Sequence, residues 1–103
     1  MDIFQWNDRL RIHIPALAQD WETYSLDERK AMISRWELIR GTIPDRVKEF
    51  EEAINRIQAE LDEEESFERC CELTYEIADF ASRINDLHIW YRTDQDVESR
   101  RHT

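Results

Sequence analysis

Apolar residues recur at alternating spacings of three and four through the second half of the chain, the pattern of helices that bury one face. The clearest stripe consists of Val47, Phe50, Ile54, Ile57 and Leu61. A wider apolar face follows between Phe67 and Tyr91, as expected of a helix with more than one neighbour. These patterns predict two helices, at 44–61 and 67–91.

The connection between these two helices is predicted to be a tight reversal at 62–66. The first stripe, continued beyond Leu61, would place apolar residues near positions 64 and 68, and both positions are Glu. The next stripe begins off phase at Phe67, and Ser66 is suited to cap the helix that follows. A single continuous rod is the alternative, since no Gly or Pro separates the stripes.

Two earlier helices are predicted. Ser25 followed by Glu28 has the spacing of a capping box, and Gly41 is expected to end that helix in a left-handed conformation. Before it, Ile3, Leu10, Ile14, Leu17 and Trp21 share one helical phase, with Asn7 in the same phase. Pro15 interrupts this segment, which predicts a kinked helix.

These elements predict an all-α protein, an antiparallel four-helix bundle with a kinked first helix. The chain of 103 residues is long enough for one core, and its single Gly and two Pro favour a few long helices over a many-turned β fold. We expect one domain at 1–92. The tail at 93–103, TDQDVESRRHT, shows no apolar stripe and is expected to be disordered.

Charge changes the picture of what the chain can bind. The net charge is −10, and residues 44–65 hold nine acids against three bases. Such a surface repels phosphate backbones, so nucleic-acid binding is not expected, whereas a basic protein partner suits it.

The sequence also bears on location. No run of about 18 apolar residues suggests a transmembrane helix, and the start of the chain, with its early acids, does not resemble a signal peptide. Cys70 and Cys71 lack the spacing of a zinc site and are expected to be buried or half-buried thiols in a reducing cytoplasm.

Two pairs of carboxylates raise the question of catalysis. Glu49 and Glu52, followed on the next helix by Glu76 and Asp79, form E-x-x-E and then E-x-x-D. This pattern resembles the metal-binding pattern of the all-α nucleotide pyrophosphohydrolases of the MazG type. The resemblance covers residues 49–79 and implies that the four carboxylates hold Mg²⁺, which bridges phosphates and helps activate a water.

Helical geometry favours a solvated surface for the same residues. At about 100° per residue, Asp79 and Glu52 lie roughly 160° and 170° from the apolar stripes of their helices. Arg83 follows Asp79 by four residues, the spacing of a surface ion pair. A metal site would then need another helix on that side, such as one from a second copy.

A contact surface is predicted at Tyr75, Ile89 and Trp90. Tyr75 and Trp90 are expected on the side of the last helix away from its core stripe, and Ile89, Trp90 and Tyr91 make the end of that helix apolar nearly all round. Such an end is expected to be covered by a subunit, by a partner or by the chain itself. His88 is expected to be a hydrogen-bonded core residue.

The sequence therefore predicts a small acidic protein-interaction or regulatory protein of the cytoplasm, without catalytic activity or cofactor. Its partner would be a protein, basic or a second copy of itself. The alternative function is that of a magnesium-dependent nucleotide pyrophosphohydrolase.

Overall fold

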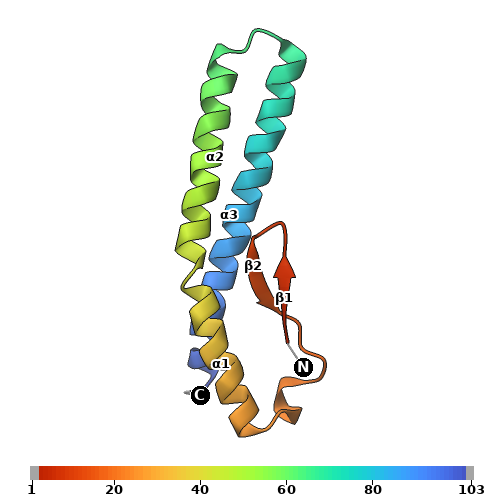
Figure 1. Ribbon diagram of the computed structural model, residues 1–103, viewed down its shortest axis with the longest axis vertical. Helices are drawn as coiled ribbons and strands as arrows, with labels where there is room; N and C mark the ends of the chain where they lie inside the picture. The colour runs from red at the N-terminus through yellow and green to blue at the C-terminus, as the bar shows by residue number, and fades with distance from the viewer. Residues whose placement is uncertain (1–2, 102–103) are drawn as a thin grey trace.

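The computed structural model describes residues 3–101, and their side chains through residue 93. The elements, in chain order, are β1 (Phe4–Asn7), β2 (Ile12–Pro15), the 3-10 helix η1 (Trp21–Thr23), α1 (Leu26–Arg40), α2 (Ile43–Glu63) and α3 (Phe67–Arg101). The molecule is elongated, 59 × 26 × 19 Å. Helices α2 and α3 run side by side, and the β1–β2 hairpin and α1 lie at one end of this pair (Figure 1).

The predicted four-helix bundle is wrong, because the N-terminal segment forms a β-hairpin instead of a kinked helix. Asn7 makes the turn: its side-chain oxygen accepts a hydrogen bond from the Leu10 N–H at 2.9 Å, and its carbonyl accepts one from the Arg11 N–H at 2.7 Å. Arg11 closes the turn with φ of 57°. The Asn side chain thus provides the local partner that favours a turn over a helix.

Pro15 fits this hairpin without strain. It pairs with Phe4 in the antiparallel register, and the neighbouring Ile3 carbonyl accepts a hydrogen bond from the Ala16 N–H. Because hydrogen-bonded and non-hydrogen-bonded pairs alternate in such a ladder, the Phe4 and Pro15 pair exchanges no backbone hydrogen bond. The missing N–H of Pro15 therefore costs the ladder nothing.

The predicted capping box at the start of α1 is confirmed. The Ser25 side chain accepts a hydrogen bond from the Glu28 N–H, and the Glu28 side chain accepts one from the Ser25 N–H. Hydrogen bonds from the Ser25 backbone and then the Ser25 side chain lower the pKa of the Glu28 carboxyl. The folded state thus favours ionised Glu28, so this contribution to stability is present above the ordinary Glu pKa and is lost as the pH falls through the lowered one.

Gly41 ends α1 as predicted, but its predicted left-handed conformation is wrong. Its backbone is right-handed, with φ of −63° and ψ of −18°, and Thr42 is also right-handed. The chain therefore keeps turning in the same sense into α2, where Pro44 occupies the first turn as expected. Helices α1 and α2 together form one bent helix of 38 residues.

The predicted reversal between α2 and α3 is confirmed, and the continuous rod is wrong. Helix α2 ends at Glu63 and α3 begins at Phe67, running antiparallel to α2 (Figure 1). Ser66 caps α3 as expected, its hydroxyl accepting a hydrogen bond from the Arg69 N–H at 3.3 Å.

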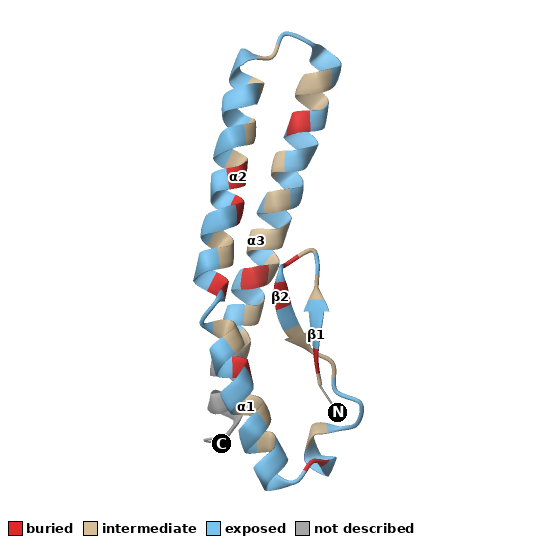
Figure 2. Cartoon of the chain, in the orientation of Figure 1, coloured by how far each residue is buried: buried red, intermediate tan, exposed pale blue. Residues whose placement is uncertain are grey.

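The core lies at the end of the molecule that holds the hairpin. Seven buried side chains form it: Phe4, Leu10, Ile12, Trp36, Ile43, Phe50 and Leu87. We call this end the base. Beyond the contact between the Phe50 and Phe80 rings, α2 and α3 continue alone to the reversal, and we call residues 51–79 the arm. Only Ala53 and Leu73 are buried in the arm, whose outer surfaces are exposed (Figure 2).

Two further expectations concern a membrane span and the end of the chain. No helix within the described residues is both long and apolar enough to cross a membrane. Helix α3 includes residues 93–101 of the predicted tail. The division into a domain at 1–92 and a disordered tail at 93–103 stays a prediction, because the side chains of 94–103 fall outside the described part of the chain.

Two leucines test the position of the core. Leu87 is fully buried and Leu38 is 77% exposed, although both lie in helices. We expect Leu87→Ala to lower the free energy of unfolding by about 2 to 5 kcal/mol, because it leaves a cavity. Leu38→Ala, the matched control, should change it by less than about 0.5 kcal/mol. Urea denaturation measures both, and equal effects would contradict this placement of the core.

Gly41 tests the bend. An added Cβ would lie 3.5 Å from the nearest atoms, the backbone oxygens of Glu37 and Leu38, which is ordinary contact. Gly41→Ala should therefore raise the free energy of unfolding by roughly 0.4 to 1 kcal/mol, because Ala has less backbone freedom to lose on folding. A fall in the thermal midpoint would indicate that this residue is left-handed after all.

Candidate functional site

The arm holds nearly all of the net charge of the chain. Its residues, 51–79, include eleven Asp and Glu and two Arg, a net of −9 out of −10. The rest of the chain has thirteen acids and twelve bases and is almost neutral. The sequence located part of this charge at 44–65, and the fold shows that α3 adds its acids to those of α2 in the arm.

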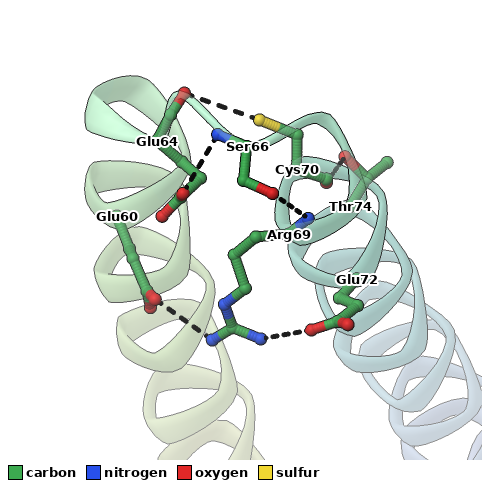
Figure 3. A network of polar contacts seen from close by, with 7 residues as sticks. All are labelled: Glu60, Glu64, Ser66, Arg69, Cys70, Glu72 and Thr74. Atoms are coloured by element: carbon green, nitrogen blue, oxygen red, sulfur yellow. Dashed lines mark hydrogen bonds and ion pairs between the residues drawn. The ribbon is translucent and has the colours of Figure 1, made fainter.

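One cation bridges the two helices of the arm near the reversal (Figure 3). The Arg69 guanidinium on α3 lies 3.1 Å from the Glu60 carboxylate on α2 and 2.9 Å from the Glu72 carboxylate on α3. Hydrogen bonds to Glu72 and then to Glu60 raise the pKa of Arg69. The bridge is exposed and so contributes little to stability, but it fixes the relative position of two acidic helices at their far end.

The two cysteines lie beside this network. Both are half-buried and neither forms a disulfide, as predicted. The Cys70 thiol points back to the Glu64 carbonyl, with Sγ and O separated by 3.6 Å (Figure 3). Cys71, the next residue, is turned about 100° away around the helix.

The four carboxylates of the pyrophosphohydrolase pattern are engaged separately. Glu49 lies 2.7 Å from Arg46 and 4.0 Å from Arg11, measured between side-chain oxygen and nitrogen. Asp79 lies 2.7 Å from Arg83, which confirms the predicted surface ion pair. These contacts use the carboxylates as partners of arginines.

The other two carboxylates, Glu52 and Glu76, are exposed. Among the described residues, no three His, Cys, Asp or Glu side chains come together in a group that could hold a metal ion. The arrangement that the resemblance implies is therefore not assembled within the described part of this chain.

The three residues of the predicted contact surface have different surroundings. Trp90 packs edge-on against Trp36 of α1, with ring centroids 5.8 Å apart, and borders the core. It therefore belongs to the base of its own chain, one of the alternatives open from the sequence. Ile89 is 50% exposed and Tyr75 is 77% exposed, so these two side chains stay accessible. Whether they bind a partner stays a prediction.

His88 and Tyr91 flank Ile89 and Trp90 at this end of α3. His88 is exposed, so its predicted place in the core is wrong. Tyr91 lies under the Arg40 guanidinium, whose central carbon is 4.8 Å from the ring centroid. At the apolar end of α3, α1 thus covers Trp90 and one face of Tyr91, whereas Ile89 stays half exposed.

Phe67 is an exposed aromatic that the sequence pattern placed in the core. It is 80% exposed, because it is the first residue of α3 and lies about 120° around that helix from Leu73, which faces α2. The sequence signal was available: Ser66 marks Phe67 as the first residue of its helix. Phe67 and Tyr75 are the arm's two exposed large hydrophobic side chains.

A hollow of about 300 Å³ lies between β1 and α1. Its walls are mainly apolar, and its two charged residues are Glu28 and Arg35. Glu28 belongs to the capping box, and the Arg35 guanidinium lies over the Phe4 ring at 5.1 Å. Both groups thus have structural roles, and the hollow presents no converging set of groups for chemistry.

A comparison with protein-family models, with curated proteins and with solved structures finds no match to this chain.

The carboxylate pattern can be tested at Asp79. Asp79 is paired with Arg83 on the surface, so Asp79→Asn should cost only about 0.3 to 0.5 kcal/mol of stability. Adding Mg²⁺ and a nucleoside triphosphate should shift the thermal midpoint of this variant by the same amount as that of the wild type. Glu37→Gln, an exposed carboxylate outside the pattern, is the control. Magnesium-dependent hydrolysis that Asp79→Asn abolishes and Glu37→Gln retains would establish the hydrolase instead.

Proposed function

We propose that this chain is a non-catalytic protein-interaction module whose acidic arm binds a basic surface of a protein partner. The observation that carries the proposal is the location of −9 of the −10 net charges in the arm, outside the core. The proposal rests on electrostatic complementarity, which sets association rate and specificity in protein complexes.

The separation of roles along the molecule supports this function. The base holds the buried cluster and is almost neutral, whereas the arm contributes only two buried side chains and much charge. Acids that merely kept the chain soluble would not need to gather on one projecting element. A concentrated field of one sign raises the encounter rate with an oppositely charged partner.

The nature of the partner follows from the same charge. Nucleic acid would be repelled by the arm. A second copy that docked arm to arm would bring two strongly acidic surfaces together, so a homodimer through this surface is disfavoured. A homodimer through Trp90 loses its original support, because that ring is packed against Trp36. A basic protein partner is the choice that remains consistent with these observations. The cytoplasmic location expected from the sequence stays a prediction.

The proposal can be tested by neutralising part of the arm. The variant replaces four exposed acids with amides: Glu51, Glu52, Glu63 and Glu65. The probe is a fluorescent helical peptide rich in Lys and Arg. If each surface contact is worth about 0.3 to 0.5 kcal/mol, the four changes together should weaken the affinity about tenfold, and added salt should reduce this difference. Fluorescence anisotropy measures the affinity.

A matched control removes the same charge elsewhere. It replaces four exposed acids outside the arm with amides: Asp20, Glu22, Asp27 and Glu37. This control should bind the peptide as the wild type does. An equal loss in both variants would mean that net charge alone attracts the peptide, and the arm would then have no special part in binding.

A further inference from the structure

Helix α3 carries a second apolar strip on its outer side within the arm. Its members, spaced by four, four and three residues, are Phe67, Cys71, Tyr75 and Ala78. At about 100° per residue these four positions fall within an arc of about 80°. The centre of that arc lies about 160° or more from Leu73 and Phe80, which face α2. We call these four residues the outer strip.

The outer strip is open in the arm, whereas its continuation at the base is occupied. Farther along the same side of α3, the hairpin reaches over the helix: Arg9 donates a hydrogen bond to the Ser82 hydroxyl at 2.7 Å and pairs with Asp86. Above that point Phe67 is 80% exposed and Tyr75 is 77% exposed. This side of α3 thus accepts another element at the base and presents bare aromatic rings in the arm.

We infer that the outer strip docks the apolar face of a basic amphipathic helix from a partner protein. The inference rests on the proposed function and specifies its partner. The strip spans 12 residues, or about 16 Å of helix, which suits roughly three turns of a partner helix. Cys71 and Ala78 are small, so the partner backbone can approach closely between the two rings.

Charge complementarity selects a basic helix as the occupant. Glu68, Glu72 and Asp79 follow the edge of the strip that Tyr75 occupies, about 20° to 60° beyond it around the helix. Glu72 and Asp79 also pair with arginines of α3, and the arm as a whole keeps its net charge of −9. The opposite edge holds uncharged residues, Thr74 and Ala81. A helix with Lys or Arg along one border of its apolar face fits this asymmetry. A second copy of this chain does not, because its own strip is bordered by acids.

The test compares two peptides of identical composition. One arranges Leu, Lys and Arg as an amphipathic helix, and the other scrambles them so that no apolar face forms. The wild type should bind the amphipathic peptide at least about tenfold more tightly, because only that peptide can cover the Phe67 and Tyr75 rings. The double variant Phe67→Ser with Tyr75→Ser should bind both peptides with the affinity that the wild type shows for the scrambled one.

The control is Leu26→Ser with Leu38→Ser, which removes two exposed apolar side chains outside the arm. It should keep the preference for the amphipathic peptide. Loss of that preference in the control, or its retention in the Phe67 and Tyr75 variant, would overturn the inference. Circular dichroism checks that the variants keep their helices, as expected for changes at exposed positions.

A footprint tests the strip with its aromatic residues intact. In Cys70→Ser, the amphipathic peptide should slow alkylation of the remaining Cys71 thiol. In Cys71→Ser, it should have little effect on the Cys70 thiol, which points toward the Glu64 carbonyl. Equal protection of both thiols, or of neither, would contradict docking on the outer strip.

The outcomes separate this inference from the proposed function. If both peptides bind equally and the arm-charge variant weakens both, the outer strip is not the docking surface and the acidic arm still is. If neither peptide binds the wild type, the proposed function and this inference are both wrong.

Discussion

The aromatic cluster at the base is the interaction on which the rest of the structure depends. Phe4 stacks parallel to Trp36 at 6.4 Å between ring centroids, and Trp36 in turn meets Trp90 edge-on. These three rings join the hairpin, α1 and α3, none of which directly follows another along the chain. Aromatic pairs of this kind add about 0.5 to 1.5 kcal/mol beyond the area that they bury. The hairpin needs such a surface to fold against, since a two-stranded sheet is barely stable alone.

The aromatic rings of the base also explain where several positive charges of the chain lie. Arg11 and Arg83 lie over the Phe50 ring at 5.2 and 5.7 Å, and Arg35 and Arg40 lie over the Phe4 and Tyr91 rings. Each guanidinium covers apolar surface that one layer of helices leaves open. Twelve of the chain's fourteen bases lie outside the arm, which keeps the base almost neutral and leaves the arm acidic. Charge segregation is thus tied to how the core is closed.

The sequence predicted the parts of the fold that depend on local signals. The capping box at Ser25, the first-turn Pro44 and the reversal before Phe67 were all correct, because each needs only neighbouring residues. The hairpin was missed, because the spacing of Ile3, Leu10 and Ile14 also fits a helix, and the Asn7 side chain that decides the turn gives no periodic signal. Its register, in addition, depends on contacts with helices far along the chain.

The sequence predicted the acidic charge of the candidate site, but it assigned some aromatic residues of α3 to the wrong side of that helix. One apolar stripe cannot describe α3, which meets only α2 in the arm but also meets α1 and the hairpin at the base. Trp90 therefore points to Trp36, although it lies away from the stripe that contains Leu73. Phe67, at the start of the helix, has the apolar character of a core residue and no neighbour to bury it. Of these three aromatic residues, Tyr75 kept the exposed place that its helical phase gave it.

The two ends of α3 pose the same physical problem and solve it differently. A pair of helices buries one side of each helix and leaves the rest to water, so any further apolar residue needs a third element. At the base the chain supplies that element, with the hairpin and the guanidinium groups of four arginines over the rings. In the arm it supplies none to cover Phe67 and Tyr75, and the surrounding charge is negative. A basic amphipathic helix would bring to the arm both things that the base already has, an apolar cover and the cations beside it.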